Sequence, residues 1–236
     1  INQQEIEGFP FDEEEAKKFY AELLVQRVEL DKQIMPYFPD WETRTVFTPK
    51  VNSKKYGYVK HVPFTKVKVH QFNPNSDKQV IERLKVQRKW EPVDFTDNGN
   101  PKIDGETLRR LGKDWPECAL LADRADVEKI IGMLAEGKNA WLKLCKTGPD
   151  GVVRIHGRVI TNGAITGRCA HFKPNLGQIP AEGEMGKRCR SLFITIPGYN
   201  LLGWDASGLE LRMLAHFMAK YDDGAYTRVV LEGDVH

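Results

Sequence analysis

The stretch LLGWDASGLELRMLAHFM, residues 201–218, decides how the C-terminal third of the chain is expected to fold. Residues 201–204 are a short apolar run, which predicts a buried strand that ends at Asp205. Residues 206–208 predict a turn, and apolar residues then recur at helical spacing over 209–217, as on the buried stripe of a helix. Asp205 is therefore expected where a strand, a turn and a helix meet.

A carboxylate in this position has two ordinary uses. It can bind Mg²⁺, with the next backbone carbonyl supplying a second hard oxygen. It can equally act as the cap of the following helix. The residues alone leave both interpretations open.

The segment before this stretch predicts β structure. Gly148-Pro149-Asp150-Gly151 is a strong turn signal, the run from Val152 to Ile160 is rich in β-branched residues, and Asn162-Gly163 marks a second turn. These features predict an antiparallel hairpin. Together with the expected helix after Asp205, they make the fold class α+β.

The first 150 residues predict helices around an insertion. Asp12 with Glu15, and Ser76 with Gln79, are capping boxes that open two helices, the first ending at Pro36. A third amphipathic helix is expected from about residue 126 to residue 144. Residues 41–72 contain Pro, Gly and Asn breaks and predict an irregular or short-stranded insertion. The arrangement fits a protruding helical hairpin, and periodicity cannot distinguish it from an ordinary bundle.

The charge is distributed in blocks, although the whole chain has a net charge of only +2. Residues 1–40 have a net charge of −6, residues 41–90 of +9, and the remainder of −1. The basic block is interleaved with aromatic residues, a combination that suits a polyanion because cations neutralise phosphates while rings stack or anchor. The alternative is a solvated arm that happens to be rich in lysine.

Several functional classes are disfavoured. The longest apolar runs span only a few residues, so we expect no membrane partner. The four cysteines contain no CxxC pair, which argues against a zinc ribbon and favours reduced thiols in a cytosol.

Four ordered motifs resemble family A DNA polymerases, most closely the replicative enzymes of short-tailed bacteriophages. WDASGLELRMLAHFM (residues 204–218) resembles motif A of that family. TNGAITGR (161–168) and PNLGQIP (174–180) resemble its template-primer motifs, and GDVH (233–236) resembles the start of the segment leading into the fingers. The resemblance implies a helical thumb in residues 1–150, with the basic insertion at about 41–72, and the N-terminal part of an antiparallel-sheet palm in residues 151–236.

The resemblance also implies the chemistry, which is the addition of deoxynucleotides to a primer 3′-hydroxyl with two Mg²⁺ ions. The implied site residues are Asp205 for catalysis and metal binding; Ala206 for metal binding; Ser207, Gly208, Leu209, Glu210 and His236 for nucleotide binding; and Arg168, Asn175 and Gln178 for DNA binding. Glu210 would exclude a ribose 2′-hydroxyl, which disfavours an RNA polymerase. Arg168 and Gln178 would contact the minor groove near the primer end, where the acceptors differ little between base pairs.

Parts of the family pattern are missing from the sequence. We find no fingers helix, no His-Asp-Glu turn with the second catalytic aspartate, and no proofreading exonuclease. We therefore expect this chain to be inactive alone and to need a second polypeptide, or a C-terminal half, besides primer-template DNA and dNTP. The junction after His236 is compatible with a natural split, an intein or an artificial truncation.

Three further expectations complete the sequence analysis. The insertion at 41–72 is much shorter than the one that binds thioredoxin in phage relatives, which argues against a thioredoxin-type processivity factor. We expect the protein to act in the cytoplasm, that of the host if it is phage-encoded. The alternative function is a non-catalytic DNA-binding or processivity subunit that retains the polymerase scaffold.

Overall fold

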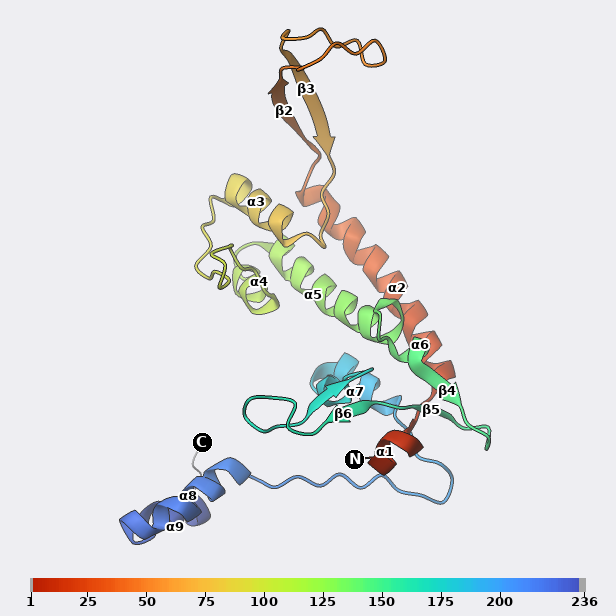
Figure 1. Cartoon of the computed structure of the whole chain (residues 1–236), viewed down its shortest axis with the longest axis vertical. Helices are drawn as coiled ribbons and strands as arrows, with labels where there is room; N and C mark the ends of the chain where they lie inside the picture. The colour runs from red at the N-terminus through yellow and green to blue at the C-terminus, as the bar shows by residue number, and fades with distance from the viewer. Residues whose placement is uncertain (1, 234–236) are drawn as a thin grey trace. The chain divides into compact units, whose positions relative to one another are not determined.

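The computed structural model describes residues 2–233 and divides into two compact units, one ending at Ile194 and the other beginning at Thr195 (Figure 1). The elements are, in chain order, α1 Asn2–Glu7, β1 Phe9–Pro10, α2 Glu13–Ile34, the 3₁₀ turn η1 Met35–Tyr37, β2 Trp41–Phe47, β3 Phe64–His70, α3 Asp77–Arg88, α4 Gly105–Leu111, α5 Pro116–Ile131, the π-helical turn η2 Gly132–Glu136, α6 Trp141–Leu144, β4 Cys145–Thr147, β5 Val153–Ile155, β6 Arg158–Ile160, β7 Ala170–Phe172, the 3₁₀ turn η3 Leu176–Gln178, α7 Gly183–Ser191, α8 Leu209–Asp222 and α9 Ala225–Glu232. Helices and antiparallel strand pairs confirm the α+β class.

The two expected helix starts are confirmed. The Asp12 carboxylate accepts a hydrogen bond from the Glu15 backbone N–H at 2.9 Å, and α2 follows. The Ser76 hydroxyl accepts one from the Gln79 backbone N–H at 3.4 Å, and α3 follows. These bonds satisfy amides that the first helical turn leaves without partners.

The first unit has two hydrophobic cores. One lies between α2, the end of α5 and the small sheet, and contains the mutually T-shaped rings of Phe11, Trp141 and Phe193. The other lies between the end of α2, α3, α4 and the start of α5, and contains the stacked pair Phe38 and Phe72. Because α2 and α5 take part in both cores, they tie the two ends of the unit together.

The insertion is more regular than expected. β2 and β3 are seven residues each and pair antiparallel over their full length, with Trp41 opposite His70 and Phe47 opposite Phe64. We call this pair of strands the ribbon. Figure 1 shows it extending beyond the end of α2, between α2 and α3 in the chain.

The expected third helix is broken and begins earlier. It starts at Pro116 rather than near residue 126, and α5 gives way at Gly132 to the π turn η2. The Gly137 amide donates a hydrogen bond to the Gly132 carbonyl at 2.9 Å, and a Cβ at Gly137 would lie only 2.4 Å from that oxygen. This close approach therefore requires glycine and ends the helical run before Trp141.

The expected hairpin is confirmed in kind but is divided. The turn at 148–151 joins β4 to β5, which pair antiparallel, and β1 completes that sheet. The chain leaves the sheet after Ile155, and β6 then pairs with β7 in a second hairpin. The single β-rich run thus contributes to two sheets instead of one.

In the second unit, two expectations were wrong. Residues 201–204 form no strand and are exposed, because no strand among the described residues pairs with them and an unpaired strand leaves its backbone groups unsatisfied. The expected buried stripe of α8 is largely exposed, at 52% for Leu209, 48% for Met213 and 67% for Phe217. α8 packs against α9, and this contact buries Ala215 and Val230.

Candidate active site

Asp205 lies on an exposed segment, four residues before Leu209, where α8 begins. Gly208 precedes the helix with φ of 60°, a left-handed conformation that glycine adopts without strain. The Arg212 guanidinium Nε donates to the Ser207 carbonyl at 2.9 Å and braces the turn. Of the two interpretations left open for Asp205, the helix cap is wrong, because Gly208 occupies the N-cap position of α8 and no side chain caps it.

The predicted metal and nucleotide residues are contiguous, so they are necessarily close together. Ala206 is half-buried, and Ser207, Gly208, Leu209 and Glu210 are exposed at the start of α8. His236, the remaining predicted nucleotide-binding residue, lies outside the described residues. Among residues 2–233, no group of three or more His, Cys, Asp and Glu side chains is placed to hold a metal ion.

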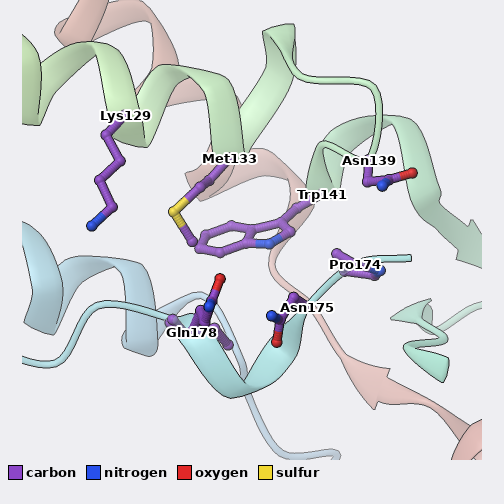
Figure 2. Close-up of a pocket in the computed structure, with 8 residues that line it drawn as sticks. Lys129, Met133, Asn139, Trp141, Pro174, Asn175 and Gln178 are labelled. Carbon is purple, nitrogen blue, oxygen red and sulfur yellow. The ribbon is translucent and has the colours of Figure 1, made fainter. Parts of the chain in front are cut away.

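Two of the three predicted DNA-binding residues line one pocket of the first unit. Asn175 and Gln178 lie at the start and end of η3, where the Asn175 side chain accepts a hydrogen bond from the Gly177 amide at 3.1 Å. The pocket has a volume of about 540 Å³ and is lined by Lys129, Met133, Asn139, Trp141, Pro174, Asn175, Gln178 and Ile179. Figure 2 shows η3 on one side of this pocket and α5 with η2 on the other.

Arg168 lies outside that pocket. It is exposed at the end of the loop between β6 and β7, where its carbonyl accepts a hydrogen bond from the Ala164 amide at 3.1 Å. Gly167, at φ of 78°, turns the chain immediately before it. The structure therefore brings Asn175 and Gln178 together and leaves Arg168 on the neighbouring loop.

Lys129 and Asn139 are polar residues of the pocket that the sequence did not single out. Lys129 is on the last turn of α5, and Asn139 follows the π turn. In the sequence each is an ordinary polar residue next to a helix end. Only the packing of α5 against the η3 segment brings them to the same pocket as Gln178.

Arg188 has a structural role between two helices of the first unit. Its guanidinium binds the carboxylates of Glu22 and Glu15 and lies 4.3 Å from the ring centroid of Phe19. Hydrogen bonding to Glu22 is the main reason that the pKa of Arg188 is raised. This contact ties α7 to α2.

The buried thiols are poorly suited to nucleophilic chemistry. Burial raises the pKa of Cys118 to about 12 and that of Cys189 to about 11. A thiol needs its thiolate form to attack, so both are inert near neutral pH.

Comparison with known proteins identifies the family. The model of DNA polymerase family A matches residues 52–225. The chain belongs to DNA polymerase family A. It is 35% identical, over its entire length, to the DNA-directed DNA polymerases of Escherichia phage T7 and Enterobacteria phage T3, and spans 40% of each relative. The resemblance drawn from the four motifs is thus confirmed.

Cellular members of the family are also similar. The thermostable DNA polymerase I of Thermus aquaticus is 32% identical over 71% of this chain, which corresponds to 19% of that protein. Among solved structures, the POL domain of Pol1 from M. smegmatis, in complex with DNA primer-template and dNTP, matches 91% of this chain and 31% of its own with a TM-score of 0.62. At 22% identity, that match shows the shared fold.

No helix within the described part of the chain is both long and apolar enough to cross a membrane.

Proposed function

We propose that this chain forms the thumb and the N-terminal part of the palm of a DNA-directed DNA polymerase. Residues 1–150 would serve as the thumb and residues 151–236 as the first part of the palm. By packing, the chain divides after Ile194, within the proposed palm segment. The observation that supports this proposal is the motif of residues 204–218 in a family A chain, with Asp205 exposed immediately before the turn into α8.

Asp205 is the proposed catalytic metal ligand. Its carboxylate and the Ala206 carbonyl are hard oxygens of the kind that Mg²⁺ prefers. Two protein oxygens are nevertheless too few to hold two Mg²⁺ ions, and the described residues contain no acidic cluster that would add others. The donor type therefore fits Mg²⁺, whereas the number of donors does not, and further carboxylates must come from outside the described residues.

The first turn of α8 is the proposed nucleotide site. Ser207, Gly208 and Leu209 place backbone groups at the helix N-terminus, where amides and the helix dipole favour phosphate. Glu210 follows on the same turn, and its carboxylate would exclude a ribose 2′-hydroxyl. His236 would contact the triphosphate.

Arg168, Asn175 and Gln178 are the proposed contacts to the primer-template duplex. Exposed Arg168 and Gln178 have side chains that donate hydrogen bonds, as readout of minor-groove acceptors requires. Asn175 already uses its oxygen to fix η3, so its amide NH₂ group remains the donor side.

The rest of the polymerase is proposed to cover α8 and α9. The apolar side chains along α8, including Leu209, Met213 and Phe217, are about half or more exposed. Contiguous exposed apolar surface of this kind marks an interface. We propose that it packs against the remaining palm and fingers, supplied by a second polypeptide or a C-terminal half.

Primer extension tests this proposal. The chain would be assayed alone and mixed with a candidate polypeptide carrying fingers and the remaining palm, taken from the adjoining reading frame. We expect no extension from the chain alone and Mg²⁺-dependent incorporation of dNTPs from the pair. Asp205→Asn should lower the rate by about 10²–10³, the usual loss when one electrostatic stabiliser of the transition state is removed.

Asp223→Asn is the matched control, because this exposed carboxylate lies in the same unit at the end of α8. It should leave the rate unchanged. A complex that assembles and binds DNA but incorporates no dNTP would refute the catalytic proposal and favour a non-catalytic DNA-binding subunit.

A further inference from the structure

The ribbon and its tip concentrate positive charge. Residues 41–72 contain seven Lys and Arg side chains and one acidic side chain, a net charge of +6 in a chain whose total is +2. Arg44 is paired with Glu42 at 3.4 Å. Within the described residues, the six lysines of this segment have no carboxylate within 4.0 Å. Their charge is therefore available to a ligand.

The strand register divides these side chains between two faces. Directly opposed residues of an antiparallel pair point to the same face, and successive residues alternate. One face carries Thr43 opposite Lys68 and Thr45 opposite Lys66. We call these four residues the lysine face. Every member is a hydrogen-bond donor, and no acidic residue shares this face within the two strands.

The opposite face has a different character. It carries the valines Val46, Val67 and Val69 together with the neutralising pair Glu42 and Arg44. The ribbon is thus electrostatically one-sided, with unpaired charge on one face and apolar side chains on the other. A protein partner would use the apolar face, because interfaces are anchored by buried apolar side chains and are poor in lysine.

The rings at the tip pack against one another. Phe64 stacks on Tyr58 with centroids 4.9 Å apart and meets Phe47 edge-on at 5.6 Å. The Lys66 ammonium lies 3.8 Å from the Phe47 ring centroid. These rings stabilise the end of the ribbon and are occupied, so they do not form the row of free rings on which single-stranded bases stack.

The base of the ribbon is fixed to the helices. The Trp41 ring stacks on His70 with centroids 5.3 Å apart, and the Arg83 guanidinium of α3 lies 4.2 Å from the Trp41 centroid. The Thr43 hydroxyl and His70 Nε2 are hydrogen-bonded at 2.8 Å. These contacts fix the end of the ribbon nearest the helices, so the first unit sets the orientation of the lysine face.

We propose that the lysine face binds the phosphate backbone of double-stranded DNA without reading sequence. Lys66 and Lys68 are about 6.6 Å apart along the strand, close to the rise of two base pairs at 3.4 Å each. The hydroxyls of Thr43 and Thr45, on the strand opposite the lysines, add neutral groups of the kind common at phosphates. The choice of DNA among polyanions rests on the proposed polymerase function, whereas the contact itself rests on the ribbon.

The salt dependence of DNA binding tests the proposal. The full-length chain would be titrated onto a fluorescein-labelled mixed-sequence 24-base-pair duplex at about 50–200 mM NaCl. Lys66→Gln/Lys68→Gln should flatten the slope of log affinity against log salt by about 1.8, because each lost phosphate contact removes about 0.9. The corresponding loss of affinity at 0.1 M salt is about 60-fold.

Two controls separate a phosphate contact from other effects. Lys17→Gln/Lys32→Gln removes the same net charge from α2, where both lysines are paired with glutamates, and should leave the slope unchanged. Lys66→Arg/Lys68→Arg keeps the charge and should keep the slope.

Because Lys66 also covers Phe47, Lys68→Gln alone gives a reading that is independent of the tip and should flatten the slope by about 0.9.

Four results would overturn the proposal. The first two are an unchanged slope in the double glutamine variant and an equal change of slope in the α2 control. The third is that the double glutamine variant changes the slope only with a 24-nucleotide single strand and not with the duplex. The fourth is that this variant loses binding to polyglutamate while its binding to the duplex is intact. The assay contains no catalytic step. If the chain shows the predicted slope change but its mixture with the candidate polypeptide fails to extend primers, the polymerase function alone is refuted.

Discussion

Replacing Arg88 with methionine is expected to destabilise the first unit strongly, because Arg88 compensates a carboxylate that has lost its water. Glu117, at the start of α5, has a side chain that is 1% exposed, against 37% for Arg88 on α3. Arg88 donates to the Glu117 Oε1 from Nε at 2.7 Å and from a terminal nitrogen at 2.6 Å. Among the described residues, the buried Glu117 Oε2 has no hydrogen-bond partner.

The two halves of this ion pair should therefore respond unequally. Arg88→Met leaves the buried charge uncompensated, which costs about 3–5 kcal/mol in buried pairs. We expect about 3 kcal/mol here, because Arg88 is partly solvated. Glu117→Met loses a charge-assisted bond of about 1.5–3 kcal/mol but also relieves about 1–3 kcal/mol of unsatisfied burial at Oε2, leaving a change near zero. The double variant should be close to neutral.

Urea unfolding followed by far-ultraviolet circular dichroism measures these changes. With an m-value of about 3 kcal/mol/M, Arg88→Met should lower the midpoint by about 1 M, and adding Glu117→Met should restore it. The coupling energy is then about −3 kcal/mol. Equal losses for the two single variants, or a double variant as unstable as Arg88→Met, would refute the unequal burial argument.

Three further outcomes are expected. Asp150→Asn should destabilise the chain at neutral pH. The difference in unfolding midpoint between this variant and the unmodified chain should shrink as pH falls from about 4 toward 2. Hydrogen bonds from Arg154 lower the pKa of Asp150 to about 2, so this contribution is present above the unfolded pKa and lost below the folded one; a constant difference in unfolding midpoint across that range would contradict it. Asp12→Ala should cost about 1 kcal/mol in urea unfolding through loss of the cap, and no loss would show that the bond to Glu15 is dispensable. Exposed Cys169 should react first with a thiol reagent, and duplex DNA should slow this reaction if the adjoining loop contacts the primer-template; an unchanged labelling rate would argue against that contact.

Local signals in the sequence predicted local structure well. The caps at Asp12 and Ser76 lie where the boxes placed them, because a cap depends on residues three positions apart. The turn at 148–151 likewise joins two paired strands, because turn chemistry is contained within the turn. The family and the α+β class followed from motifs of this short range.

Features that neither apolar periodicity nor turn residues encode were beyond the sequence. The break between α5 and α6 requires the approach of Gly137 to Gly132, which no periodicity reveals. Residues 201–204 have strand-like composition, yet a strand exists only where another strand pairs with it. Of the candidate site, the contiguous residues 205–210 could be proposed from the motif alone. Lys129 reaches the pocket beside Gln178 only through tertiary packing.

The stacking of Phe38 on Phe72, with ring centroids 4.0 Å apart, has a consequence for how this protein tolerates change. Phe38 lies just before the ribbon and Phe72 just after it, so the ribbon leaves the helices and returns to them at almost the same point. Insertions whose ends already meet can be lengthened, shortened or exchanged at little entropic cost, since closure entropy grows only slowly with loop length. The segment between the stacked rings can therefore change in length and sequence among related proteins while the helical core stays the same.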